Sequence, residues 1–121
     1  MANEISVSLR LAVNNGYIVH QENPGTNSLD MSGIVATGGI QSIGTTEEAL
    51  AMGDVSSPGY AYFRNCDKAN YVEIGVKPAA TFYPFAKLKY GEAAIIRLGT
   101  ATPYAKANTG AVSLQYYILA D

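Results

Sequence analysis

The feature that most constrains the fold is the alternation of side chains near the start of the chain. Residues 5–13 place Ile, Val or Leu at every second position. A period of two is the repeat of a strand with one face on a core, whereas an amphipathic helix repeats about every 3.6 residues. Asn14-Asn15-Gly16 follows, and Asn-Gly supplies the positive φ angles of a tight hairpin turn. The sequence therefore predicts a β-hairpin, with residues 17–21 as the returning strand.

Short runs of β-branched and aromatic residues continue along the chain, separated by Gly, Pro and Asn. They predict further strands at 34–37, 40–43, 60–65, 71–76, 82–88, 93–98, 104–107 and 113–119. The first two could also be one strand bent at a glycine bulge, and residues 45–50 favour one helical turn without excluding a strand. A spacing of about 8–12 residues is typical of sandwiches and closed barrels. The prediction is an all-β, antiparallel β-sandwich, jelly-roll-like, with eight to ten short strands.

Three positions in this scheme carry more specific expectations. Residues 22–33 are rich in turn formers, including Pro24-Gly25, and predict a long exposed loop. Pro84 places the first half of its strand at a sheet edge or bulge. The nearly continuous apolar run at 93–98 is typical of a central strand buried on both sides. A chain of 121 residues is long enough for one core, so we expect a single domain over 1–121.

Composition limits the classes of partner. The 121 residues carry 8 Lys and Arg against 10 Asp and Glu, so no basic excess is present to neutralise phosphates. Nucleic acid is therefore not expected as a partner. No uncharged stretch approaches the roughly twenty apolar residues of a membrane span, and residues 1–7 lack the pattern of a signal peptide. We expect no membrane contact and synthesis in the cytoplasm.

The sequence contains few of the residues from which catalytic sites are usually built. Cys66 and His20 are each the one residue of their kind, so a disulfide framework and a Cys/His zinc cluster are not expected. Nothing in the spacing brings Cys66 and His20 together as nucleophile and base. A glycosidase-like pair of carboxylates is possible in number among Glu47, Glu48, Glu73 and Glu92. However, Glu47 and Glu48 would point apart on a strand, Glu73 and Glu92 lie on different segments, and no Trp is present to stack on a sugar. The sequence predicts a protein that is not an enzyme and holds no cofactor and no metal.

The number of tyrosines is the most distinctive feature of the composition. There are nine, with three Phe and no Trp, while charged residues make up only 15% of the chain, against roughly a quarter in typical domains. Tyr suits partly wet interfaces because its ring is apolar and its tip is polar. Several could line a subunit interface, although packing of strand faces or a carbohydrate groove are alternatives. The candidate interface residues are Tyr60, Tyr62, Tyr83, Tyr104, Tyr116, Ile5, Asn23 and Pro24.

The chain from residue 53 onward resembles a group of small structural proteins of tailed bacteriophages. In that group a strand that ends in an Asn-rich turn, a second alternating strand, a "LKxGE"-like turn and a "YAKA"-like strand follow in this order. The matching phrases here are GYAYFRN at 59–65, NYVEIGV at 70–76, LKYGEA at 88–93 and YAKAN at 104–108. They cover a little over half of the chain, and the first fifty residues carry no part of the resemblance.

The resemblance implies a virion protein, a β-sandwich that assembles into symmetric oligomers. The expected role is a capsid cement (decoration) protein, made in the host cytoplasm, on the exterior of the capsid. The expected partners are the major capsid protein and further copies of the chain, as a homotrimer, with the N-terminal segment or residues 22–33 as an arm that reaches a neighbour. The alternative is a phage tail or fibre module that binds host-surface glycans.

Overall fold

The computed structural model describes residues 3–99 and 102–121. The chain divides into two compact units, Met1–Ser32 and Gly33–Asp121, which corrects the expectation of one domain over 1–121. The described residues contain strands and a single 3₁₀ turn, η1 (Pro78–Ala80). None of their helical segments has the length and apolar character needed to cross a membrane.

The first unit is the predicted hairpin, formed by β1 (Ile5–Asn14) and β2 (Val19–Leu29). Its turn is built by asparagine side chains. The Asn15 Oδ1 atom accepts hydrogen bonds from the backbone N–H groups of Tyr17, at 2.9 Å, and Ile18, at 2.7 Å. Gly16 takes a φ of 90°, which a residue with a side chain rarely adopts. The predicted strand and the turn at Asn-Gly are confirmed. The turn has four residues, 15–18, so the returning strand begins at Val19 and not at residue 17, and the apolar face of β1 is buried only at Ile5 and Val7.

Residues 22–33 are largely strand, not the predicted loop. The strand β2 runs to Leu29, with a bulge in which Asn23 and Pro24 lie opposite the single residue Arg10. The Asn23 Oδ1 atom accepts a hydrogen bond from the N–H of Gly25 at 3.0 Å, and Gly25 has a φ of 81°. The turn-forming residues therefore serve a bulge, where a proline without an N–H is tolerated. Residues 22–28 are exposed, as predicted, whereas Leu29, Met31 and Gly33 are half-buried.

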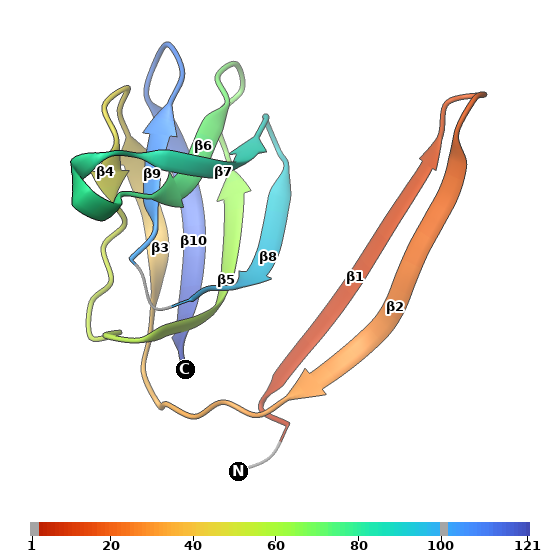
Figure 1. Cartoon of the computed structure of the whole chain (residues 1–121), viewed down its shortest axis with the longest axis horizontal. Helices are drawn as coiled ribbons and strands as arrows, with labels where there is room; N and C mark the ends of the chain where they lie inside the picture. Colours follow the sequence, from red (N-terminus) through yellow and green to blue (C-terminus); the bar gives the residue numbers. More distant parts are fainter. Residues whose placement is uncertain (1–2, 100–101) are drawn as a thin grey trace. The chain divides into compact units, whose positions relative to one another are not determined.

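The second unit is a sandwich of two antiparallel four-stranded sheets, in the orders β3-β10-β5-β8 and β4-β9-β6-β7 (Figure 1). The strands are β3 (Ala36–Ile43), β4 (Glu48–Ala49), β5 (Pro58–Asn65), β6 (Val72–Val76), β7 (Tyr83–Leu88), β8 (Ala93–Arg97), β9 (Tyr104–Ala107) and β10 (Val112–Ala120).

The pairing of these strands is that of a jelly roll. The first strand of the sandwich pairs with the last, the second with the last but one, and so on inward to β6 with β7. Two further pairings, β10 with β5 and β9 with β6, join these pairs into the two sheets. Such a pattern arises when a long hairpin wraps around a common core. The predicted fold class is confirmed.

Several local predictions are resolved by this topology. Residues 36–43 form one strand, and the 45–50 segment contains the short strand β4. The strand β7 is a sheet edge with a bulge at Phe85, as Pro84 indicated. The predicted central strand at 93–98 is wrong, because β8 is an edge strand and mostly exposed. Its apolar run reflects two apolar faces, one turned into the sandwich and one outward.

The core lies between the sheets and follows the period of two. Along β10, alternate residues from Val112 to Ala120 are buried, and the residues between them face outward. Leu114 and Ile118 on β10 are fully buried, as is Phe63 on the neighbouring strand β5. Burial of such a side chain contributes about 2 kcal/mol, so this layer supplies much of the driving force for folding.

Among the residues that the structure describes, Asn65 is the polar residue that is fully buried in this core. The Asn65 side-chain amide donates hydrogen bonds to the carbonyls of Asn70 and Leu88, both at 2.9 Å, and its Oδ1 accepts one from the Asp67 N–H at 2.8 Å. Its backbone N–H donates to the Glu92 carbonyl. Asn65 thus joins the end of β5 to the β5–β6 connection, to the end of β7 and to the β7–β8 connection.

The substitution Asn65→Ala tests this arrangement. It leaves the buried Leu88 carbonyl and the part-buried Asn70 carbonyl and Asp67 N–H without this partner, and each loss at a buried group costs about 1–3 kcal/mol. We expect the free energy of unfolding, measured by urea denaturation, to fall by about 3 kcal/mol or more. The exposed Asn27 is the matched control, and Asn27→Ala should change the free energy by less than about 0.5 kcal/mol. Equal effects of the two substitutions would contradict the role given to Asn65.

Candidate interaction surfaces

The outer face of the β3-β10-β5-β8 sheet is apolar and aromatic. Cross-strand pairing places Tyr117 beside Tyr62, and Tyr62 beside Ile95, so these three side chains form a row across the sheet. Tyr117 is 53% exposed and Ile95 37%. Leu119, Tyr60 and the exposed Ile40 extend the patch along the strands. We call the set of Ile40, Tyr60, Tyr62, Ile95, Tyr117 and Leu119 the tyrosine face.

The charges on this face are cationic. Among the described strand residues that point outward from this sheet, the charged ones are Arg64 and Arg97. The Arg97 guanidinium lies 4.6 Å from the centroid of the Tyr60 ring and 2.7 Å from an oxygen of Asp121. Tyr and Arg are enriched at protein interfaces, where Asp, Glu and Lys are depleted. The composition of the face is therefore that of a protein-binding surface.

The predicted interface residues separate into two groups. Tyr60 and Tyr62 lie on the tyrosine face and are partly buried. The other candidates lie elsewhere: Tyr83 on the edge strand β7, Tyr104 on β9 with Lys77 5.9 Å from its ring centroid, Ile5 buried at the start of β1, and Asn23 and Pro24 exposed in the β2 bulge.

Tyr116 belongs to the core. It is 4% exposed and its hydroxyl donates a hydrogen bond to the Ala51 carbonyl at 2.8 Å. The next residue, Tyr117, points outward and was missing from the sequence-predicted interface. The alternation of the strand could have distinguished the inward tyrosine from the outward one. Leu114 and Ile118 lie an even number of residues from Tyr116, so all three share the inward face. Ile95 was missed because the predicted central strand left it no exposed face.

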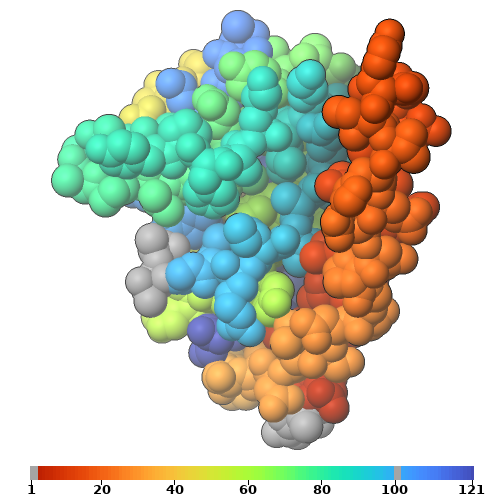
Figure 2. Space-filling view, turned by 45° about the vertical axis from the view of Figure 1, so that its right-hand side comes forward, coloured from red at the N-terminus to blue at the C-terminus, as the bar shows by residue number. Residues whose placement is uncertain are grey.

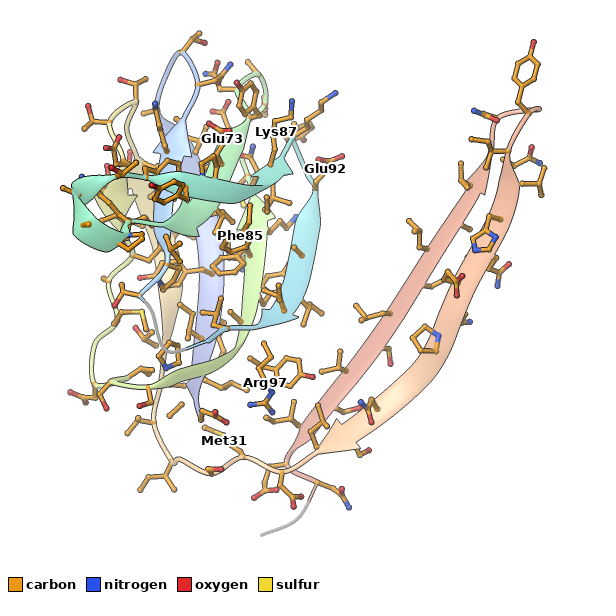
Figure 3. The ribbon with its side chains drawn as sticks, in the orientation of Figure 1. Met31, Glu73, Phe85, Lys87, Glu92 and Arg97 are labelled. Atoms are coloured by element: carbon orange, nitrogen blue, oxygen red, sulfur yellow. The ribbon has the colours of Figure 1, made fainter. Side chains whose placement is uncertain are left out.

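A second apolar surface lies where the edge strands β7 and β8 meet. It is a groove of about 290 Å³ whose apolar lining residues are Val76, Phe85, Ile96, Leu98 and Pro103. Ile96 is the cross-strand partner of the buried Ala61, so its side chain lies on the inward face of β8. It is nevertheless 43% exposed. The bulge in β7 falls at Phe85, which extends away from β7 in Figure 3 and is 51% exposed. Core-facing side chains are thus left uncovered at this side of the sandwich.

The polar groups considered for catalysis occupy structural positions. The His20 Nε2 atom lies 2.6 Å from Glu22 on the exposed hairpin, and Cys66 is exposed in the turn after β5. Glu92 accepts a hydrogen bond from the Lys89 N–H in the β7–β8 turn, and Glu73 is paired across strands with Lys87 (Figure 3). Within residues 3–99 and 102–121, no three His, Cys, Asp or Glu side chains gather as metal ligands would.

A jelly roll serves viral capsid proteins, lectins and cupin enzymes alike, so the fold by itself does not assign a function. Comparison of the chain with protein families, curated proteins and solved structures finds no match. The resemblance of residues 53–121 to phage structural proteins therefore stays a prediction from the residues that carry it.

The two neighbouring tyrosines give a test of the inward and outward assignments. Burial raises the pKa of the Tyr116 hydroxyl above its ordinary value of 10.0. The folded state therefore holds this proton more tightly than the unfolded chain, so stability is complete below pH 10 and is lost as the pH rises toward the folded pKa. We expect Tyr116→Phe to cost about 1 kcal/mol at neutral pH and to make the alkaline decline shallower.

The measurement is the free energy of unfolding of each variant from about pH 8 to about pH 11. Tyr117→Phe is the control, because Tyr117 is the exposed neighbour on the same strand. An identical pH dependence of the two variants would show that Tyr116 is not the buried residue of the pair.

Proposed function

We propose that the chain is a non-enzymatic virion protein of a tailed bacteriophage, a cement protein that binds the outside of the capsid shell. The observation that supports this most is the tyrosine face, a sheet surface with exposed aromatic and aliphatic side chains and no carboxylate on its described strand residues. Apolar patches of this kind mark protein-binding sites on soluble domains. The partner is the major capsid protein, and the chain is made in the host cytoplasm.

Stabilisation of a shell needs contacts that span more than one subunit. A sheet face of four strands and about five residues covers roughly 300 Å², less than the ~800 Å² per partner of a typical stable interface. One such contact is weak by itself. A homotrimer presents three of them at once, and linked weak contacts gain affinity through effective concentration. Separation of the capsid subunits beneath it would then require loss of all three contacts.

The proposal is tested with shells of the major capsid protein encoded in the same genome, assembled without this chain. Added protein should bind to a fixed number of copies per shell and raise the melting temperature of the shell. Tyr62→Glu and Tyr117→Glu should each weaken binding at least tenfold, as is common for central interface aromatics. The control is Tyr90→Glu, which changes a 59% exposed tyrosine of the β7–β8 turn.

Three outcomes would contradict the proposal. One is no binding to such shells, and another is equal loss for the Tyr90 and Tyr117 variants. The third is binding to host cells or glycan arrays by a few copies per particle, which would instead favour the tail or fibre module.

A further inference from the structure

The N-terminal hairpin has an apolar row that its own strands leave uncovered. Leu9, Leu11 and Val13 lie on one face of β1 and are 46%, 66% and 40% exposed. The hairpin is a compact unit of only two strands. An isolated two-stranded hairpin is marginally stable in water and needs a third strand or another apolar surface. We therefore expect another apolar surface to cover this row.

The two edges of the hairpin differ in how well they are protected against pairing with a further strand. The outer edge of β2 is interrupted by the bulge and by Pro24, features that prevent pairing with another strand. The strand β1 is regular over Ile5–Asn14, contains no proline, and pairs only with β2 among the described strands. Its outer edge is thus free to accept a further strand.

The sandwich has one edge of the same kind. The strand β8 reads Ala-Ala-Ile-Ile-Arg and pairs only with β5 among the described strands. It has no proline, glycine or register shift. The other edges are blunted: β7 by Pro84 and a bulge, β3 by Gly39 at a φ of 141°, and β4 by its length of two residues. In the space-filling view the sky-blue segment that contains β8 lies at the surface (Figure 2).

The apolar groove runs beside this unprotected edge. Ile96 belongs both to β8 and to the groove, so a strand added to β8 would have every second side chain above the groove. A strand with apolar residues at every second position fits this geometry, and β1 is such a strand. Strand addition of this type takes affinity from backbone hydrogen bonds and specificity from alternate side chains.

We propose that β1 of one copy adds to the β8 edge of a second copy and lays Leu9, Leu11 and Val13 over its apolar groove. Charge favours the same contact. Residues 1–32 hold the acids Glu4, Glu22 and Asp30 against one cation, Arg10, whereas Arg64 on β5 lies opposite Ala93 of β8. The other cation at this edge, Arg97, is paired with Asp121. The contact goes beyond capsid binding, since it concerns only copies of this chain.

The occupant is a second copy, because every copy of the chain carries both the donor strand β1 and the acceptor edge β8. Each copy then has one donor strand and one acceptor edge, a head-to-tail contact that closes into a ring when the rotation permits. A closed ring would provide the homotrimer of the cement proposal.

The test uses full-length variants and their mass by light scattering over a hundredfold range of concentration. Leu11→Asp alters the donor row, and Ile96→Asp alters the acceptor groove. We expect an oligomer for the unaltered chain, and at least a tenfold rise in the dissociation constant for either variant. Ile34→Asp, at a 98% exposed position outside both surfaces, should keep the oligomer. Phe85→Ser replaces Ile96→Asp if circular dichroism shows that the latter is unfolded.

Mixing separates contact between copies from contact within one copy. The Leu11 variant keeps an intact β8 edge, and the Ile96 variant keeps an intact hairpin, so together they should form a one-to-one pair. Two folded variants that remain monomeric on mixing would overturn the proposal, as would an unaltered chain that is monomeric throughout or an oligomer that survives Leu11→Asp. Shell binding through the tyrosine face is measured separately, so either proposal can fail while the other stands.

Discussion

The buried amide of Asn65 is the contact on which the form of the sandwich depends. The chain passes between the sheets at the β5–β6 and β7–β8 connections, and Asn65 binds groups of both. Hydrogen bonds inside a protein are directional and costly to leave unmade, so this residue fixes the spacing of the sheets at one end. At the other end, around Val76 and Leu98, β7 and β8 meet in the apolar groove. The groove thus lies at the end away from the polar contact.

The sequence predicts those parts of the fold in which one physical signal dominates. Alternation at 113–119 identifies a strand because one of its faces lies on the apolar core. The same period identifies β1 at 5–13, although Leu9, Leu11 and Val13 are exposed there. The Asn-Gly turn at Asn15-Gly16 is equally clear, since few residues adopt its backbone angles. Tyr116 and Tyr117 show what the sequence could have given in addition, because the parity of Leu114 and Ile118 separates the inward tyrosine from the outward one.

The errors arise where one local pattern is compatible with two environments. Asn23-Pro24-Gly25 can end a strand or form a bulge within one, and the choice depends on the pairing of β2 with β1 over its whole length. The apolar run at 93–98 is the same whether neighbouring strands cover both faces or whether an edge strand carries two apolar faces. Long-range strand order decides this, and it cannot be read from a window of six residues.

The edge position of β8 connects the two proposed interactions. Its residues alternate between the tyrosine face, at Ile95, and the groove, at Ile96. A strand added to this edge would therefore extend the outer face of the sheet while it covers the groove. Binding of a partner stabilises the conformation that binds it. A hairpin of two strands is only marginally stable by itself, so a contact with a second copy would have a large effect on it. Contact between copies would then stabilise the hairpin and enlarge the face that we propose to bind the capsid, so that assembly of the oligomer and attachment to the shell would strengthen each other.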